Sequence, residues 1–153
     1  MNGEKLIAML QGEPFELQQT MLDDYADYVE IDEQFLYDLI FEIRDAKLFR
    51  YVMEQYCSGV DVSEDFLREV NDSFHNPALL KHALQKFYDG RQVSEAFLSD
   101  LAIDYRDESL LRSVMEHYFA GGRISTGFLH EIVLIFESEE LTEYVLRNHY
   151  RAE

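Results

Sequence analysis

Four segments of the chain repeat one pattern: IDEQFLYDL at 31–39, VSEDFLREV at 62–70, VSEAFLSDL at 93–101 and ISTGFLHEI at 124–132. Each contains a Phe-Leu pair, and the pairs begin 31 residues apart, at Phe35, Phe66, Phe97 and Phe128. Self-similarity at a fixed period of roughly 20–50 residues is the signature of repeat proteins, in which each repeat is one supersecondary unit. This repeat therefore decides the fold before any local motif is considered.

The rest of the 31-residue unit keeps the same register. Further apolar positions follow each Phe-Leu pair at helical spacing, and an aromatic residue comes near the end of the unit. That aromatic position is held by Tyr56, Phe87 and Tyr118, and by His149 in the last copy. The substitution predicts a packing role for His149. A glycine then recurs with the same period, at Gly59, Gly90 and Gly121.

Each unit predicts two helices, because a good N-cap residue precedes two apolar-periodic stretches. The caps are Asp32, Ser63, Ser94 and Ser125 for the first helices, and Asp45, Asn76, Asp107 and Ser138 for the second. An apolar residue before each first cap has the spacing of a hydrophobic staple: Ile31, Val62, Val93 and Ile124. Pro77 stands at the first position of a helix, and the recurring glycines suit the left-handed C′ position that ends the second helices.

Residues 1–32 match the unit only in part. LIAML at 6–10 supplies a first helix, and the second-helix positions are matched by Leu17, Met21, Leu22 and Tyr25. Two residues are missing between these helices, and no glycine ends the second. Terminal repeats are often atypical because one face has no neighbour. The units expected are about 1–32, 33–63, 64–94, 95–125 and 126–153.

A helix pair cannot bury its apolar stripe alone, so the units should stack into a single all-α domain over residues 1–153, without strands. This organisation resembles the α-solenoid class, to which tetratricopeptide and HEAT-type proteins belong, and the resemblance implies a short right-handed solenoid. The resemblance is one of architecture, because the tetratricopeptide Trp and the ankyrin Thr-Pro-Leu-His motif are absent. No functional residues are carried over from those families.

The amino-acid composition indicates the kind of partner and the cellular compartment. The 153 residues carry a net charge of −18, which disfavours binding to nucleic-acid phosphates or anionic membranes and favours a basic protein partner. The short apolar run near the N-terminus is too short for a signal peptide, and no apolar stretch is long enough to span a membrane. These features predict a cytoplasmic protein. The single cysteine, Cys57, shares its register with large aromatic residues, which predicts an inert packing position.

The acidic residues are concentrated near the N-terminus. Between Lys5 and Arg44 there is no basic residue and there are ten carboxylates. They are Glu13, Glu16, Asp23, Asp24, Asp27, Glu30, Asp32, Glu33, Asp38 and Glu42. Asp32 is explained as a helix N-cap, and Glu33 lies in the first turn of the same helix, where the helix dipole favours an acidic residue. Neither residue needs a binding partner to explain its presence.

The predicted partner-binding surface therefore omits Asp32 and Glu33. It consists of Glu13, Glu16, Asp23, Asp24, Asp27, Tyr28, Glu30, Tyr37, Asp38 and Glu42. Tyr28 and Tyr37 are included because they have no fixed position in the repeat, whereas Tyr25 occupies the aromatic core position. Carboxylates interleaved with tyrosine suit the docking of Lys and Arg side chains.

No motif of catalysis or metal binding is found in the sequence. The five histidines and Cys57 form no HExxH or CxxC, and there is no Gly-rich phosphate loop. The acidic segment DDYADYVEIDE at 23–33 lacks the central glycine and ligand spacing of a calcium-binding EF-hand. We therefore expect a non-enzymatic protein with no catalytic residues, no metal site and no cofactor.

Small, acidic, single-domain proteins of this kind resemble bacterial immunity proteins and antitoxins. That resemblance implies a monomer that forms a one-to-one complex with a nuclease toxin, in which carboxylates take the place of nucleic-acid phosphates and occlude the basic active-site groove. Two alternatives remain. One is an adaptor or scaffold that binds a peptide or helix in the solenoid groove, with acidity serving only solubility. The other is a phage inhibitor that imitates nucleic acid.

Overall fold

The computed structural model describes residues 1–57 and 59–150, and these residues form ten α-helices and one short 3₁₀ helix, joined by loops, with no strand. The prediction of an all-α stack of helical hairpins is confirmed. Two compact units make up the chain, Met1–Phe87 and Tyr88–Glu153. No helix within the described ranges has both the length and the apolarity needed to cross a bilayer.

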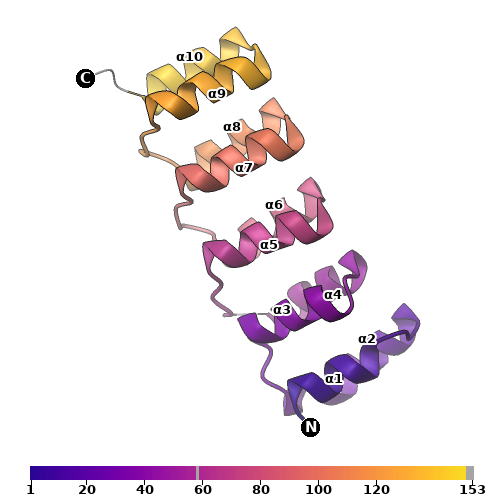
Figure 1. The fold of residues 1–153 in the computed structure, drawn as a ribbon. Helices are drawn as coiled ribbons and strands as arrows, with labels where there is room; N and C mark the ends of the chain where they lie inside the picture. The colour runs from indigo at the N-terminus through magenta and orange to yellow at the C-terminus, as the bar shows by residue number, and fades with distance from the viewer. Residues whose placement is uncertain (58, 151–153) are drawn as a thin grey trace. The chain divides into compact units, whose positions relative to one another are not determined.

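The first unit contains three helical hairpins. Its helices are α1 (Gly3–Leu10), α2 (Phe15–Tyr25), the 3₁₀ helix η1 (Ala26–Tyr28), α3 (Glu33–Glu42), α4 (Ala46–Tyr56), α5 (Glu64–Phe74) and α6 (Pro77–Phe87). The first helices of the hairpins contact one another, α1 with α3 and α3 with α5, while α4 contacts α6. The unit therefore has two layers, one of α1, α3 and α5 and one of α2, α4 and α6 (Figure 1).

The second unit contains two hairpins. Its helices are α7 (Glu95–Tyr105), α8 (Glu108–Tyr118), α9 (Thr126–Phe136) and α10 (Glu139–Asn148). As in the first unit, the first helices of the hairpins pack together, α7 against α9. The loop before each of these first helices also forms a backbone hydrogen bond with the C-terminal end of the second helix of the same hairpin. The Val93 N–H donates to the Tyr118 carbonyl at 2.8 Å, and the Ile124 N–H donates to the His149 carbonyl at 2.8 Å.

The predicted helix starts are confirmed by their capping hydrogen bonds. The hydroxyls of Ser63 and Ser125 accept from the N–H groups of Phe66 and Phe128, both at 3.2 Å. The other predicted caps, Asp32, Asp45, Asn76, Ser94, Asp107 and Ser138, accept in the same way. A side-chain acceptor at each of these starts satisfies an N–H group that has no partner inside the helix. The short polar residues at these register positions are thus explained by capping.

The predicted helix ends need correction. Gly59, Gly90 and Gly121 do have positive φ angles of 75–79°, but they lie one position beyond the predicted C′ position, in a turn after the second helix. In the last of these turns the Gly122 N–H donates to the Phe119 carbonyl at 2.9 Å. The helix ends that use the left-handed conformation are those of the first helices. They use it without glycine, at Arg44, His75, Arg106 and Glu137, with φ of 47–50°.

The core is formed mostly by the repeat positions, and the first hairpin departs from this pattern. The four phenylalanines of the Phe-Leu pairs are all buried. In α2, however, Leu17 is 41% exposed although it shares the register of the buried Leu48. Gln18 is buried instead, and its amide donates to the Leu10 carbonyl at 2.9 Å. Tyr25 is only half-buried.

Carboxylates tie successive hairpins together, a feature that the sequence reading did not foresee. The hydroxyl of Ser63, which caps α5, also donates to Glu33 of α3 at 2.7 Å. In the second unit, the hydroxyl of Ser125 donates to Glu95 at 3.1 Å, and that of Ser138 to Glu108 at 2.6 Å. Each bond joins the first turn of one helix to the cap of the equivalent helix in the next hairpin. Part of the chain's acidity therefore serves the stacking of the repeats.

Candidate partner-binding face

The structure does not gather the ten predicted residues into one patch. Asp38 and Glu42 lie on α3 and line a groove against α1, and Tyr28 and Glu30 line an adjoining depression. Tyr37 lies on α3 beside α5. The remaining five are all exposed and belong to α2, to η1 or to the α1–α2 loop: Glu13, Glu16, Asp23, Asp24 and Asp27. A hairpin places its two helices in different layers, so neighbours in sequence are separated in space.

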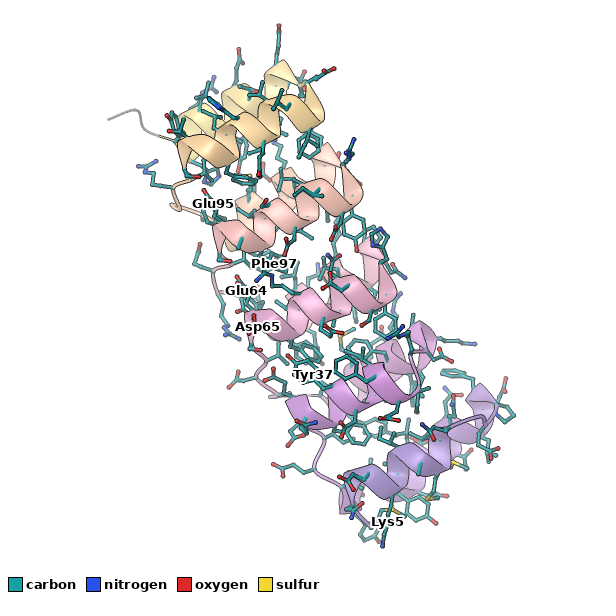
Figure 2. The ribbon with its side chains drawn as sticks, in the orientation of Figure 1. Lys5, Tyr37, Glu64, Asp65, Glu95 and Phe97 are labelled. Atoms are coloured by element: carbon teal, nitrogen blue, oxygen red, sulfur yellow. The ribbon has the colours of Figure 1, made fainter. Side chains whose placement is uncertain are left out.

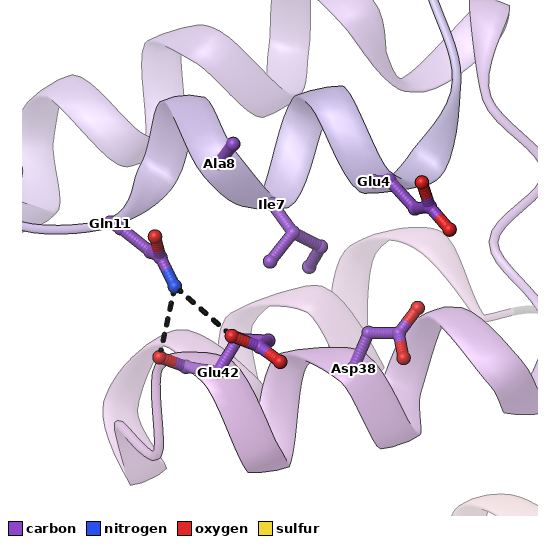
Figure 3. Close-up of a pocket in the computed structure, with 6 residues that line it drawn as sticks. All are labelled: Glu4, Ile7, Ala8, Gln11, Asp38 and Glu42. Atoms are coloured by element: carbon purple, nitrogen blue, oxygen red, sulfur yellow. Dashed lines mark hydrogen bonds between the residues drawn. The ribbon is translucent and has the colours of Figure 1, made fainter.

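The groove between α1 and α3 has a volume of about 260 Å³ (Figure 3). It is lined by Glu4, Ile7, Ala8, Gln11, Asp38 and Glu42. The Gln11 amide donates to the Glu42 carbonyl at 3.2 Å and reaches the Glu42 carboxylate at 3.5 Å. Asp38 accepts from Gln34 at 3.0 Å. The groove thus presents three carboxylates around a small apolar floor, and two of them are oriented by amide donors.

A second depression of about 490 Å³ adjoins this groove at the N-terminal ends of α1 and α3. Tyr28, Glu30 and Asp38 contribute to its wall, and Glu4 and Asp38 are shared with the first groove. Tyr28 is 71% exposed, as a contact residue requires. Glu4 was missed in the sequence reading because it precedes Lys5 and so falls outside the stretch without basic residues.

Asp23 is held within the fold by tyrosines of α4. Its carboxylate accepts hydrogen bonds from the hydroxyls of Tyr51, at 3.1 Å, and of Tyr56. Burial, and next the hydrogen bond to Asp23, raise the pKa of the Tyr56 hydroxyl, so it remains a donor at neutral pH. These contacts join the first two hairpins in the α2/α4/α6 layer. Asp23 therefore has a structural role that the sequence pattern did not suggest.

Tyr37 lies at an aromatic cluster between α3 and α5. Its ring packs edge-on against Phe66 with centroids 5.1 Å apart and is stacked with Phe41 at 6.0 Å. Burial raises the pKa of the Tyr37 hydroxyl, a hydrogen bond with Ser63 lowers it, and nearby carboxylates, among them Asp65, raise it further. Figure 2 shows Tyr37 below the start of α5, where Asp65 lies. Phe41, 53% exposed, is the accessible ring of the cluster.

Charge is segregated between the two layers of the first unit. Helices α1, α3 and α5 carry eight carboxylates and two basic residues. Helices α2, α4 and α6 carry four of each. All eight carboxylates are exposed or half-buried: Glu4, Glu33, Asp38, Glu42, Glu64, Asp65, Glu69 and Asp72. We call this surface, with Phe41 and Tyr37 among the carboxylates, the acidic layer.

Cys57 and His149 are both buried. Cys57 is 1% exposed, as its register predicted, and burial raises the pKa of its thiol to about 12. His149 is also buried, with one ring nitrogen 3.0 Å from the Gly122 carbonyl and the other 3.2 Å from the Tyr144 hydroxyl. The packing roles predicted for both residues are confirmed. Within the part of the chain that the structure describes, no three potential metal ligands cluster together.

Comparison with known proteins assigns no family to the chain. No family model, no curated protein and no solved structure matches it. The functional interpretation therefore rests on the surfaces described above, of which the acidic layer is the largest concentration of like charge.

Proposed function

We propose that the protein is a non-enzymatic binding module that holds a basic protein through its acidic layer. One observation carries the proposal. Within a single compact unit, eight carboxylates against two basic residues lie on one layer, whereas the other layer carries four of each. Acidity that served solubility alone would not need to differ between the layers.

The chemistry of the layer suits lysine and arginine. Opposed charges speed the encounter of two proteins and select the partner by sign. Phe41, exposed beside Tyr37, offers a ring face over which a guanidinium can stack. Glu42 and Asp38 are oriented by amide hydrogen bonds. A partner side chain that pairs with them therefore meets carboxylates that have already lost part of their conformational freedom.

The partner class we propose is a nuclease toxin, inhibited in a one-to-one complex in the manner of an immunity protein or antitoxin. A nuclease must bind phosphates, and it does so with Lys and Arg in its substrate groove. Carboxylates spaced along stacked helices offer the same sign of charge as a nucleic-acid backbone. Bound in the groove, they would exclude the substrate without any chemical step.

The contact residues in this proposal differ from those expected from the sequence. Tyr28, Glu30, Asp38 and Glu42 remain, because they line the depressions on the α1/α3 side. Glu4 joins them, as do the carboxylates of α5. The carboxylates of α2 are not part of the proposed contact, because they belong to the other layer and Asp23 accepts hydrogen bonds from tyrosine hydroxyls.

Two triple variants with equal charge change test the surface. The first, Glu4→Gln/Glu42→Gln/Asp65→Asn, alters the acidic layer. The second, Glu13→Gln/Glu16→Gln/Asp24→Asn, alters α2 and the loop before it. Binding of a deca-arginine peptide is measured by fluorescence anisotropy. We expect the first variant to bind about tenfold more weakly, since each lost exposed ion pair removes about 0.5 kcal/mol. The second should differ from wild type by less than about twofold.

Salt distinguishes this mode from apolar docking in an adaptor. Affinity for the peptide should fall steeply between about 50 mM and about 300 mM NaCl, because exposed ion pairs are screened. Equal loss in both triple variants would show that only net charge matters and would contradict the role of the acidic layer.

Co-expression tests the nuclease part of the proposal separately. The product of the adjacent gene is expressed with wild-type protein or with the acidic-layer variant, and cell growth is followed. Protection by wild type that is lost in the variant is the expected result. A protein that neither binds this product nor protects the cells would contradict the inhibitor role, while leaving the peptide result in place.

A further inference from the structure

One outward position of the repeat carries exposed apolar residues that the fold does not require. The position lies on the first helix of each of the four hairpins that keep the 31-residue period, at Phe41, Asp72, Ile103 and Leu134. Phe41 and Ile103 are 53% and 52% exposed although α3 packs against α5 and α7 packs against α9. The next hairpin therefore does not cover this position. Asp72 shows that the repeat accepts a charged residue there.

Ile103 and Leu134 lie on neighbouring helices of the second unit. Helices α7 and α9 pack together (Figure 1), and the Ser99 hydroxyl donates to the Glu131 carboxylate between them at 2.9 Å. Ser99 is one turn before Ile103 on α7, and Glu131 is one turn before Leu134 on α9. The two exposed apolar side chains therefore lie at the same level, close enough for one partner segment to contact both.

The same face of α9 begins with a glycine that no internal contact explains. Gly127 lies two turns before Leu134, at the position where α3 carries Gln34 and α7 carries Ala96. Glycine weakens a helix relative to other residues. Beyond its adjacent residues and the backbone of α9 itself, a Cβ at Gly127 would meet only the Ser125 hydroxyl, at 3.8 Å, which is ordinary contact. Close approach of another molecule would explain a glycine at this position.

Carboxylates surround these residues. Helices α7 and α9 together hold four carboxylates and neither lysine nor arginine. Three of them, Asp100, Asp104 and Glu131, lie within one turn of the exposed apolar pair. We call the surface of Gly127, Ile103, Leu134 and these three carboxylates the α7/α9 outer face.

We propose that the α7/α9 outer face binds a helix of a basic partner protein. Charge selects this occupant, because lysines or arginines beside an apolar stripe pair with the carboxylates while the stripe covers the apolar pair. A second copy of the chain that used the same face in a symmetric contact would bring carboxylates against carboxylates. The α7/α9 outer face shares no residue with the acidic layer, so this inference goes beyond the proposed function and does not depend on it.

The spacing within the face favours a helix as the bound segment. Gly127 and Leu134 are seven residues apart on α9. A partner helix aligned with α9 presents side chains at i and i+7 with the same rise of about 10.5 Å. One of these side chains would occupy the space above Gly127, and the other would lie against Leu134 and Ile103. Basic residues of the turn between them would face Glu131 and Asp100.

The test uses the full chain and a helical peptide of about 18 residues built only from Leu and Lys, with the leucines on one stripe. A peptide with Glu in place of Lys is the charge control. We expect the Leu-Lys peptide to bind and to shift the amide resonances of α7 and α9. The Leu-Glu peptide should bind at least about tenfold more weakly, because its charges oppose those of the face.

Two matched double variants locate the contact. Ile103→Ser/Leu134→Ser should weaken binding of the Leu-Lys peptide by about tenfold or more, because two apolar side chains that binding would bury are lost. Val133→Ser/Leu146→Ser removes two exposed apolar residues of the same unit outside the face and should change affinity by less than about twofold. Thermal unfolding shows that each variant is folded. All four positions are substantially exposed, so truncation leaves the core intact.

A substitution at Gly127 separates binding from stability. Gly127→Gln introduces the residue type that α3 has at the equivalent position. We expect the midpoint of thermal unfolding to rise, because glutamine favours a helix more than glycine does. Affinity for the Leu-Lys peptide should nevertheless fall by at least about fivefold, because the new side chain occupies the space that the partner helix needs. Unchanged affinity would contradict the predicted approach over Gly127.

Three further results would overturn the proposal. Resonance shifts confined to α3 and α5 would assign the peptide to the acidic layer and leave the proposed function standing. Equal binding of the Leu-Lys and Leu-Glu peptides would show that charge does not select the occupant. Self-association in analytical ultracentrifugation that Ile103→Ser/Leu134→Ser abolishes would identify the occupant as a second copy. Conversely, loss of peptide binding in this variant together with unchanged binding of deca-arginine would establish two separate surfaces.

Discussion

At the scale of single residues, adjacent carboxylates have different tasks. Asp23 accepts hydrogen bonds from Tyr51 and Tyr56 and so links α2 to α4, whereas Asp24 is an exposed residue of the same helix. Asp23→Ala should lower the free energy of unfolding by about 1–2 kcal/mol, because hydrogen bonds to a charged acceptor are lost. Asp24→Ala should change it by no more than about 0.5 kcal/mol. Urea unfolding of both variants measures the difference, and equal effects would show that the tyrosine bonds contribute nothing.

At the scale of the elements, the helix ends use the left-handed conformation in two ways. Arg106 ends α7 with φ of 49° although it carries a Cβ, and Gly121 follows α8 with φ of 75°. Left-handed backbone costs a non-glycine residue roughly 1 kcal/mol. Arg106→Gly should therefore raise the free energy of unfolding by about 0.5–1 kcal/mol, and Gly121→Ala should lower it by a similar amount.

Thermal and urea unfolding of these two variants check the signs. An alanine Cβ at Gly121 would meet no atom within 4 Å, so its cost comes from the backbone conformation and not from a clash. Gly121→Ala without loss of stability would mean that the turn after α8 rearranges freely. Arg106→Gly with reduced stability would mean that the arginine side chain contributes more than the backbone strain removes.

At the scale of the whole molecule, 31 acidic residues against 13 basic ones repel one another in the folded state. Charges interact over about 30 Å at 10 mM ionic strength but over only about 10 Å at 100 mM. Since folding brings the carboxylates closer together, the free energy of unfolding should rise by about 1 kcal/mol or more when salt is added over this range.

Urea unfolding at matched concentrations of NaCl and KCl measures this effect. Screening predicts the same increase with both salts, because it depends on ionic strength alone. A larger increase with one cation would indicate specific binding of that ion. No increase with either salt would show that the carboxylates are far enough apart, or sufficiently hydrogen-bonded, to make their repulsion negligible.

Recurrence in the sequence was enough to predict the helices and most of the core positions. The caps at Ser63, Asn76 and Asp107 were found because a capping side chain acts within three residues of its own position. The left-handed conformation of Arg44 and His75 was not predicted, because helix ends of this kind are usually recognised by a glycine and neither position has one. Bonds such as Ser63 to Glu33 were also missed, since they join residues 30 positions apart.

The sequence by itself determined the period, the two helices of each hairpin and the concentration of acid near the N-terminus, because each of these depends on local order along the chain. Only the tertiary structure decided which carboxylates share a surface. Alternate helices of the first unit lie in opposite layers. Asp23 and Asp38 are therefore in different layers, whereas Glu4 and Asp38 line the same groove.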